Sequence, residues 1–378
     1  MKLNIAIVGA GVSGIILGSL LKKYLNVNIS IYEKRDQLFN NINGLQLSPN
    51  STQILDLINF SEIFKKEEFL SIEKLKVHDL YSGKLLSEIL LKFNQKQKYI
   101  SINRSLFLKK IFQYFKLSEN IVYEEIKDID SQNNEIIVKN NKFFFDYIFL
   151  CDGIFSKLKK NIADQSISFS GLYALRGTYD LTNDNSSNIN LWLGENEHLV
   201  NYKINNFEIS QYNIVWITKN LQNVPISTEN YDEKNQYLHE MFKEKFSEKF
   251  KFIGKTNSIS VWPIYKTKNI FFGYKNIFCL GDSSHGFIPS RAQGASQAIE
   301  DAYVLFKLLE KNNLNQENVT HQRLRRIKRI IKKSEKTIFI YHLRNSLLKF
   351  IRNSFLKIFT NSKIFSSLLN KDIFNFKL

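Results

Sequence analysis

The sequence predicts an α/β fold in which a β-rich region interrupts an alternating β–α domain, and helices form the last part of the chain. Two observations lead to this prediction. The chain opens with an apolar strand, a glycine-rich turn, a helix and a second strand, which ends at Glu33. Between about residues 165 and 265 the pattern changes to short alternating strands separated by turns. The 378 residues, of which 43% are hydrophobic, are enough for two cores.

The first element is a strand–turn–helix unit. Residues 4–8 form an apolar strand, and the run GAGVSG at residues 9–14 leads into a helix. At this spacing Gly9 permits a tight turn, Gly11 lets the backbone approach a pyrophosphate, and Gly14 lets the helix pack against the strand. The helix N-terminus adds unpaired amides and a positive dipole. This unit therefore predicts a dinucleotide site.

The second strand, residues 27–32, leads into an acidic residue. Glu33 lies 19 positions after the last glycine of the turn. An acidic side chain at this place accepts hydrogen bonds from ribose hydroxyls and repels an added 2′-phosphate. The dinucleotide is therefore expected to be FAD or NAD rather than NADP.

A hairpin at residues 74–92, with its turn at residues 81–84, interrupts the α/β pattern. Short strands of alternating apolar residues return within residues 166–265. A hairpin and a strand-rich segment that both interrupt the α/β pattern are most simply combined in one domain. We therefore expect a single β-rich domain inserted into the α/β domain.

The bulk composition argues against several classes of protein. The formal charge of +17 comes mostly from Lys residues scattered along the chain, and no aromatic–basic module is present, so nucleic-acid binding is not expected. Cys151 and Cys279 lie far apart in apolar runs, which argues against a disulfide framework or a metal site and favours the cytoplasm. No window reaches the ~18 uninterrupted apolar residues of a membrane span.

Two later segments carry a resemblance to a known family. Residues 276–285 read NIFCLGDSSH, and residues 292–302 read AQGASQAIEDA. Together with the glycine turn, they resemble the class A FAD-dependent aromatic-ring monooxygenases, and most of all the salicylate hydroxylase branch. Further matching segments are Gly44–Asn50, Arg104 with Leu106, Cys151–Gly153 with Ser156, Ser170–Gly177, Leu191–Gly194 with His198 and Tyr202, and Trp262–Pro263.

The resemblance implies a Rossmann-like FAD-binding domain of the glutathione reductase and p-hydroxybenzoate hydroxylase type, with an inserted β-rich substrate domain and C-terminal helices. The expected FAD-binding domain is discontinuous. It comprises residues 1–73, 93–165 and 266–320, the substrate domain comprises residues 74–92 and 166–265, and the C-terminal helical segment comprises residues 321–378.

The resemblance also implies the chemistry. NAD(P)H reduces a noncovalent FAD, O2 reacts with the reduced flavin, and a small aromatic or phenolic substrate is hydroxylated by the resulting flavin hydroperoxide. The sequence holds no second glycine fingerprint, so NAD(P)H is expected to bind transiently rather than in a domain of its own.

Most of the expected site residues bind the cofactor. Asp282, at the end of a strand, is placed to bind a ribityl hydroxyl, and the helix that begins near Gly294 directs its positive end towards the flavin. In the family, the residue pair that corresponds to Asp152 and Gly153 is associated with both FAD and the nicotinamide cofactor. His285 is expected to anchor the flavin-side loop rather than to act as a base. The full set is Gly9, Gly11, Val12, Ser13, Gly14, Glu33, Lys34, Gln46, Arg104, Asp152, Gly153, Asp282, Pro289, Gly294 and Ala295.

The expected catalytic residues are His198 and Tyr202. Removing the proton of a ring hydroxyl raises the electron density at the carbon that is attacked, and histidine has a suitable pKa for this step. The two residues lie four apart on a predicted strand and therefore share a face. Related hydroxylases carry such a pair at the substrate. We therefore expect His198 to be the base and Tyr202 its hydrogen-bonding companion.

The C-terminal segment contains two amphipathic, basic stripes. The first is Leu324, Ile327, Ile331, Ile338 and Tyr341, and the second is Leu347, Leu348, Ile351, Phe355, Ile358 and Phe359. Such stripes normally pack on a globular core, and we expect this here. The alternative is loose attachment to an anionic membrane surface.

Two other functions stay open at this point. One is an oxygenase of the ubiquinone pathway, or of another lipophilic substrate. The other is a redox sensor that binds FAD without turning over an organic substrate. The sequence does not distinguish NADH from NADPH, and no pattern indicates an oligomeric state.

Overall fold

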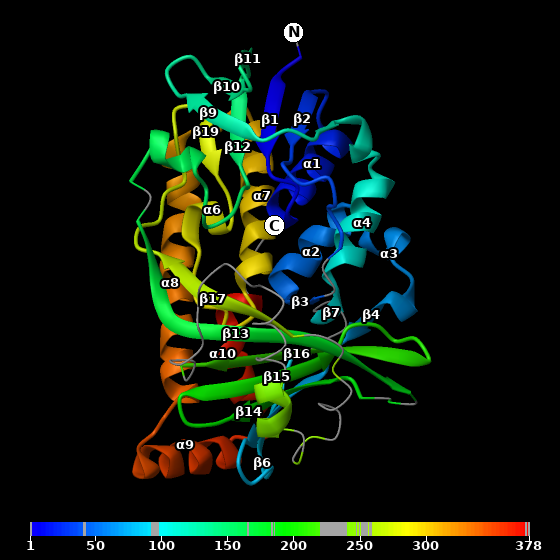
Figure 1. The fold of residues 1–378 in the computed structure, drawn as a ribbon, viewed down its shortest axis with the longest axis vertical. Coiled ribbons are helices and arrows are strands. Elements are labelled where there is room, and N and C mark those ends of the chain that lie inside the picture. Colours follow the sequence, from blue (N-terminus) through cyan, green and yellow to red (C-terminus); the bar gives the residue numbers. More distant parts are fainter. Residues whose placement is uncertain are drawn as a thin grey trace.

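The computed structural model describes residues 2–40, 43–91, 98–164, 166–182, 184, 186–219, 240–246, 248, 250, 256, 259–374 and 376. Two large sheets lie one above the other in Figure 1, and the long helix α8 (Gln316–Tyr341) runs beside both. This architecture confirms the predicted α/β fold with an inserted β-rich region.

The six-stranded sheet carries the dinucleotide motif. Its strand order is β18 (Gly273–Tyr274), β19 (Ile277–Cys279), β12 (Tyr147–Leu150), β1 (Asn4–Val8), β2 (Asn28–Tyr32) and β8 (Ile121–Val122). All neighbours are parallel except β18 and β19. The carboxyl ends of parallel strands meet at one edge, which gathers the segments that follow β1, β2, β12 and β19.

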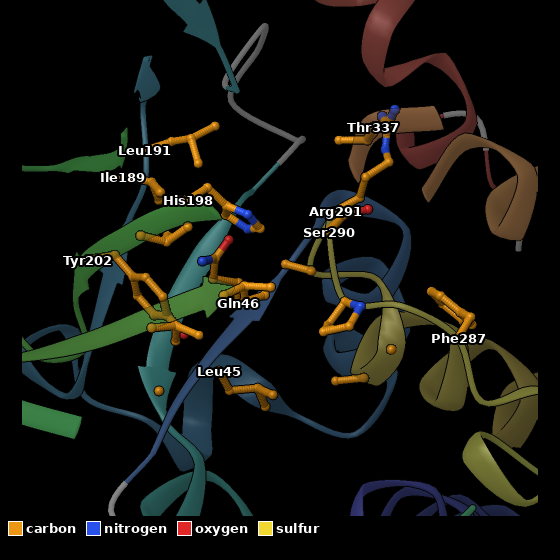
Figure 2. Close-up of a pocket in the computed structure, with 18 of the residues that line it drawn as sticks. Leu45, Gln46, Ile189, Leu191, His198, Tyr202, Phe287, Ser290, Arg291 and Thr337 are labelled. Atoms are coloured by element: carbon orange, nitrogen blue, oxygen red, sulfur yellow. The ribbon is translucent and has the colours of Figure 1, made fainter. Parts of the chain in front are cut away.

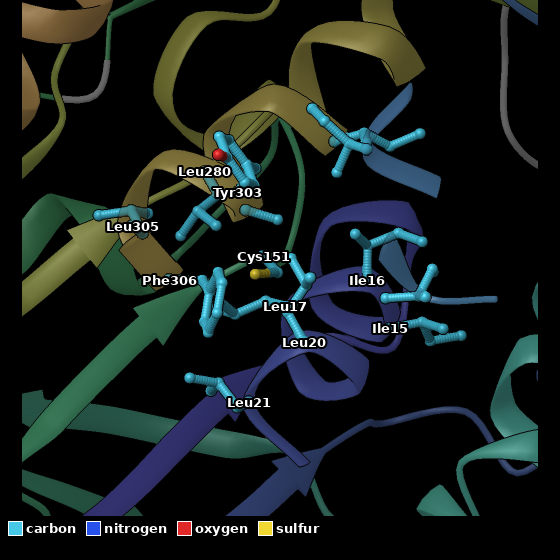
Figure 3. Close-up of a cluster of buried hydrophobic side chains, with 14 of the residues drawn as sticks. Ile15, Ile16, Leu17, Leu20, Leu21, Cys151, Leu280, Tyr303, Leu305 and Phe306 are labelled. Carbon is cyan, nitrogen blue, oxygen red and sulfur yellow. The ribbon is translucent and has the colours of Figure 1, made fainter. Parts of the chain in front are cut away.

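One face of this sheet is covered by helices and the other by a small sheet. Helix α1 (Val12–Tyr24) and helix α7 (Gly294–Glu310) pack together on the first face. Figure 3 shows their apolar side chains in contact, including Leu17 of α1 and Phe306 of α7. The opposite face packs against the antiparallel sheet of β9 (Ile126–Asp130), β10 (Glu135–Val138) and β11 (Asn141–Phe144). Both helices begin at the edge of the sheet where the motif residues gather.

The seven-stranded sheet brings together two segments that are far apart in sequence. Its order is β17 (Ile259–Thr267), β13 (Ile167–Thr182), β16 (Ile209–Thr218), β15 (Glu197–Lys203), β14 (Asn188–Leu193), β5 (Lys74–Asp79) and β6 (Leu85–Leu90). The predicted hairpin thus joins the strands of the predicted insertion through the parallel pair β14–β5. This strand order supports the proposed division into an FAD-binding domain and a substrate domain.

The remaining elements before the C-terminal helices include a second three-stranded sheet in the order β3, β7 and β4. They are β3 (Gly44–Leu47), β4 (Phe69–Ser71), β7 (Ile100–Asn103), α2 (Pro49–Leu57), α3 (Phe60–Ile63), α4 (Arg104–Tyr114), α6 (Asp282–His285) and the 3-10 turns η1 (Lys66–Glu68), η2 (Leu117–Glu119) and η3 (Leu158–Asn161).

The C-terminal helices α8, α9 (Ser346–Ile358) and α10 (Lys363–Phe374) decide between the two expectations for the apolar stripes. The first stripe packs on the core, with Ile327 and Ile338 buried, as predicted. The second does not: Leu347 and Ile358 are 65% and 75% exposed. The expectation that it packs on the flavin domain is therefore wrong, because the other face of α9 meets β6. No described helix is long and apolar enough to span a membrane.

Candidate active site

A cavity of about 870 Å³ lies between the two sheets and the C-terminal helices. Its lining comes from the carboxyl edge of the six-stranded sheet, one face of the seven-stranded sheet, the three-stranded sheet of β3, β7 and β4 with its flanking residues, and the segments Gly286–Ala295 and α8–α10. Figure 2 shows His198 and Gln46 on one side, and Ser290 and Arg291 on the other. The cavity therefore joins the predicted cofactor site to the predicted substrate domain.

The three glycines of the glycine turn have two different roles. Gly9 and Gly14 are required by the packing of the backbone, whereas Gly11 faces the cavity. A Cβ on Gly9, whose φ is +102°, would lie 2.6 Å from the carbonyl oxygen of Cys151, and one on Gly14 would lie 2.0 Å from that of Gly9. A Cβ on Gly11 would meet nothing within 4 Å, and Gly11 lines the cavity. The chain itself needs Gly9 and Gly14. The space at Gly11, at the N-terminus of α1, fits a diphosphate.

Glu33 fixes this turn. Its Oε2 accepts a hydrogen bond from the amide of Ala10 at 2.9 Å, and its Oε1 accepts one from the amide of Arg35 at 3.0 Å. Each carboxylate oxygen can accept more than one hydrogen bond, so a ribose hydroxyl can be added to these contacts.

Most of the expected cofactor residues line the cavity. Gly9, Gly14, Glu33, Lys34 and Asp152 are not among the lining residues. Lining residues from the predicted set are Gly11, Val12, Ser13, Gln46, Arg104, Gly153, Asp282, Pro289, Gly294 and Ala295.

Asp282, Arg104 and Arg176 form a charged group on the cavity wall. Burial by the surrounding protein raises the pKa of Asp282, although the nearby charges of His285, Arg104 and Arg176 act to lower it. Burial also lowers the pKa of Arg104, and the nearby Arg176 adds to this effect. Two guanidinium groups next to one carboxylate give the cavity a surplus of positive charge, which suits the anionic parts of FAD.

Asp152 carries a shifted pKa beside the glycine turn. Burial raises its pKa to about 6, and its Oδ1 is buried with no hydrogen-bond partner among the described residues. Asp152 lies two residues after the end of β12, at the carboxyl edge of the sheet. A buried carboxylate oxygen without a partner can accept a hydrogen bond from a ligand hydroxyl.

The loop that carries Asp282 rests on a buried ionic network. The Nε2 of His285 and the amide of Gly281 both donate to Oδ2 of Asp301, at 2.7 and 2.8 Å. Arg323 of α8 donates to Oδ1 of Asp301 at 2.7 Å and binds Glu300. Burial alone would raise the pKa of Asp301, but His285 and Arg323 outweigh it and lower the pKa to about 2. The structure thus places His285 as an anchor of the loop.

The substrate side of the cavity is one face of the seven-stranded sheet. In β15, His198, Val200 and Tyr202 all line the cavity, as the period of two requires. Pairing extends this face across the sheet, because Val200 is opposite both Val215 of β16 and Leu191 of β14. The wall is therefore mostly apolar, with a few polar groups.

His198 has a different partner from the one predicted. Its Nδ1 lies 2.7 Å from Nε2 of His342, which directly follows α8, and the side chain is buried. Burial lowers the pKa of His198 well below its ordinary value, and His342 lowers it further. Burial also lowers the pKa of His342 to about 4. Both imidazoles are therefore neutral at neutral pH.

Tyr202 is hydrogen-bonded to the side chain of Gln46, and Oε1 of Gln46 accepts a hydrogen bond from the hydroxyl of Tyr99 at 2.9 Å. Burial raises the pKa of Tyr202 to about 12. The prediction that Tyr202 and His198 share a face is correct. In place of the predicted hydrogen bond between them, His198 pairs with His342 and Tyr202 pairs with Gln46. Gln46, expected beside the cofactor, thus contacts the proposed catalytic tyrosine.

Sequence reasoning assigned no role to Arg176 and His342. Arg176 lines the cavity, and its Nε is buried without a hydrogen-bond partner among the described residues. An arginine in a mostly apolar predicted strand is the sequence signal that could have identified Arg176. His342 carried no such signal, because it lies 144 residues from His198 and only tertiary packing joins the two.

Two family models match the chain. An FAD binding domain matches residues 138–317, and an NAD(P)-binding Rossmann-like domain matches residues 7–53. The chain is 22% identical to 6-methylsalicylate 1-monooxygenase of Aspergillus terreus, over 82% of this chain and 75% of the relative. It is 23% identical to 3-hydroxybenzoate 6-hydroxylase of Klebsiella oxytoca, over 80% and 79%. For salicylate hydroxylase of Pseudomonas putida the identity is 22%, over 81% and 76%.

Solved structures share the whole fold. HpxO of Klebsiella pneumoniae, complexed with FAD and uric acid, matches with a TM-score of 0.81 at 15% identity, over 98% of this chain and 97% of that one. A salicylate hydroxylase substrate complex matches with a TM-score of 0.77 at 16% identity, over 100% and 96%. With the motifs and the family models, these findings show that the chain is similar to the class A FAD-dependent aromatic-ring monooxygenases. It is an FAD-dependent oxidoreductase.

Replacing Gly11 by Val is expected to abolish FAD binding without unfolding the protein. The backbone at Gly11, with φ of −81°, accepts a side chain, and its Cβ would enter free space. The valine would then occupy the space that the diphosphate needs. Titration of the apoprotein with FAD, followed by flavin fluorescence, measures the effect. Gly14→Val is the contrast, since its clash with Gly9 should prevent folding. Unchanged FAD affinity in Gly11→Val would place the diphosphate elsewhere.

Proposed function

We propose that this enzyme uses NAD(P)H and O2 to hydroxylate a small aromatic or phenolic substrate. One observation carries the proposal: a single cavity joins the FAD-binding edge to a mostly apolar sheet face that bears His198 and Tyr202. Cavities of this kind, with a few convergent polar groups, bind small organic ligands. The relatives named above act on aromatic acids, as their names state.

The cofactor has its residues on the other wall. Gly11, Val12 and Ser13 at the start of α1 would hold the diphosphate, and Asp282 would accept a hydrogen bond from a ribityl hydroxyl. The positive N-terminus of α7 at Gly294 would stabilise negative charge on the flavin. When bound and reduced, FAD would supply the activation of O2. NAD(P)H binds transiently at the same cavity.

His198 acts as the base that accepts the proton of the substrate hydroxyl. A neutral imidazole is ready to accept a proton at Nε2, and the Nδ1 proton can pass to His342, 2.7 Å away. The low pKa of both groups makes them weak bases in the free protein. A phenolate formed beside His198 raises its pKa through the opposite charge. Tyr202, positioned by Gln46, donates a hydrogen bond to the substrate.

Arg176 gives the cavity a preference for anions. Its Nε lacks a hydrogen-bond partner among the described residues, and its neighbours include Tyr202 as well as Asp282. An unpaired guanidinium donor at this depth favours a carboxylate or a phenolate. Aromatic acids and phenols are therefore the substrates to test first.

The cytoplasm is the proposed location. Both cysteines, Cys151 and Cys279, are buried free thiols, and burial raises the pKa of each. Such thiols are typical of a reducing compartment.

Substrate-stimulated consumption of NADH or NADPH tests the function. We expect one of the two coenzymes to be oxidised faster when an aromatic acid or phenol is added, with a product heavier by one oxygen atom. Peroxide must be measured in parallel, since uncoupled turnover consumes coenzyme without product. A protein that binds FAD but whose coenzyme oxidation responds to no aromatic compound would instead be a redox sensor.

A further inference from the structure

The outer face of α9 and α10 is an exposed apolar surface next to the cavity. Ten of the large apolar side chains that are exposed in the described part of the chain lie in one stretch of thirty residues. They are Phe339 and Ile340 at the end of α8, Leu347, Leu348, Phe350, Ile351, Phe355 and Ile358 of α9, and Ile364 and Leu368 of α10. Six of the ten are between 62% and 76% exposed, namely Phe339, Leu347, Phe350, Ile358, Ile364 and Leu368. A soluble protein rarely gathers so many on one face unless that face binds something.

The helices are held firmly while this face stays open. The inner side of α9 carries Arg352, which donates to the carbonyls of Ile340 and Tyr341 at 3.1 and 3.3 Å. Leu356 and Leu369 pack with the apolar residues of β5, β6 and β14. The exposed face therefore belongs to two helices that pack firmly on the protein through their inner sides. It is not the result of a poorly packed chain end.

The charge of this surface selects its partner. Residues 336–371 contain seven Lys or Arg residues and no Asp or Glu. Arg344, Lys357 and Lys363 are exposed beside the apolar side chains. A second copy of the chain docked symmetrically would set this positive surface against itself, which is repulsive. An anionic lipid surface matches both features, because it accepts apolar side chains and attracts Lys and Arg.

The cavity opens at the same surface. Ile340 and Phe355 line the cavity and are also 45% and 47% exposed. Arg291, from the flavin-side loop, donates to the carbonyl of Leu369 in α10 at 2.7 Å, which ties that loop to the helix pair. In Figure 1 α9 lies at the end of the molecule that is remote from β1 and β2. Docking by α9 thus leaves the FAD-binding domain in water.

We propose that the outer face of α9 and α10 docks on an anionic membrane surface, and that the cavity mouth at Ile340 and Phe355 takes up an apolar aromatic substrate from it. The docking stands on the exposed surface alone. The uptake rests on the proposed hydroxylase function. Tyr341, Leu356 and Leu369 supply the apolar path from the mouth into the cavity.

Vesicle co-sedimentation of the FAD-loaded enzyme tests the docking. Vesicles of phosphatidylglycerol and phosphatidylcholine should bind it at low salt, whereas vesicles of phosphatidylcholine alone should bind it far less. Phe350→Glu with Ile358→Glu should abolish binding, since both side chains are exposed and their replacement leaves the core intact. Phe144→Glu is the matched control, because Phe144 is 57% exposed on β11 and should leave binding unchanged.

Charge variants test the lipid preference. Lys357→Gln and Lys363→Gln should each weaken binding roughly fivefold, while Lys311→Gln at the end of α7 should have no effect. Flavin absorbance confirms that each variant is folded. Absence of vesicle binding at low salt overturns the proposal, and so does binding that the Phe350 and Ile358 variants retain. A concentration-dependent dimer that these variants abolish would identify a second copy as the occupant and would also overturn it.

Coenzyme oxidation separates this proposal from the proposed function. If vesicles bind but no aromatic compound stimulates coenzyme oxidation, the docking surface is established and the hydroxylase function fails. If water-soluble aromatics are hydroxylated but vesicles do not bind, the function stands and the docking fails. Uptake from the membrane predicts that an alkylphenol carried in anionic vesicles is oxidised by the wild-type enzyme and at least about tenfold more slowly by the double Glu variant, because this variant loses two apolar contacts with the membrane and gains two negative charges.

Discussion

Replacing His198 by Asn is expected to slow hydroxylation by about 10²–10⁴-fold, which is the typical loss when a general base is removed. The affinity for FAD should change little, because His198 lies on the sheet face opposite the glycine turn. Asn keeps a polar group in the buried site but cannot accept and pass on a proton. Rapid-reaction measurements of product formation, after the flavin has been reduced, separate this step from coenzyme binding.

The matched control is His78→Asn. His78 lies on β5 next to Val77, which lines the cavity, so its ring points to the other face and stacks on Trp192. Its replacement should leave the hydroxylation rate unchanged. His342→Gln tests the partner: if His342 takes up the Nδ1 proton, this variant should slow the same step and shift its pH profile. An unchanged rate and an unchanged pH profile in His198→Asn would show that the base lies elsewhere.

Replacing Arg323 by Met is expected to reduce the free energy of unfolding by about 3–5 kcal/mol, the usual cost of breaking a buried ion pair from one side. Arg323 is 1% exposed and bridges Glu300 and Asp301, so its loss leaves Glu300 with Arg326, and Asp301 with His285, as the remaining charged partners of two buried carboxylates. The network also holds Gly281 and His285, so the loop that carries Asp282 should loosen and FAD should bind less tightly. Chemical denaturation of the apoprotein measures the first effect, and FAD titration measures the second.

Arg325→Met is the control for this variant. Arg325 is exposed on the same helix, and its loss should change stability by no more than about 0.5 kcal/mol. The pH dependence gives a second test. Because the pKa of Asp301 is lowered to about 2, its stabilising effect is complete above the pKa of an unfolded aspartate, about 3.9, and is lost as the pH falls towards 2. Equal stability of the Arg323 and Arg325 variants would mean that the network does not hold the fold together.

The resemblance to the family and the fold class were readable from sequence because they depend on local patterns. The spacing of Gly9, Gly11 and Gly14 fixes a turn between a strand and a helix, and the structure shows why two of these glycines are required. The same holds for β15, where a period of two was enough to place His198 and Tyr202 on one face. The first apolar stripe of α8 was also predicted correctly, since a helix whose apolar side chains recur every three to four residues buries that side.

Contacts between distant segments were not readable in this way. The hydrogen bond of Gln46 to Tyr202, and the pairing of His198 with His342, join residues from different elements. The second stripe on α9 has the same pattern as the first, and only its surroundings differ: β6 meets the other side of the helix, and nothing in the described part of the chain covers the apolar side.

The sequence by itself determined the α/β fold, the dinucleotide turn and the family resemblance, because each depends on residue types at fixed short spacings. Only the tertiary structure decided which polar side chains share the cavity, which partner lowers the pKa of His198, and which apolar stripe stays exposed. The physical reason is that pKa values and exposure depend on what surrounds a side chain, and the surroundings come from segments that the chain brings together only when it folds.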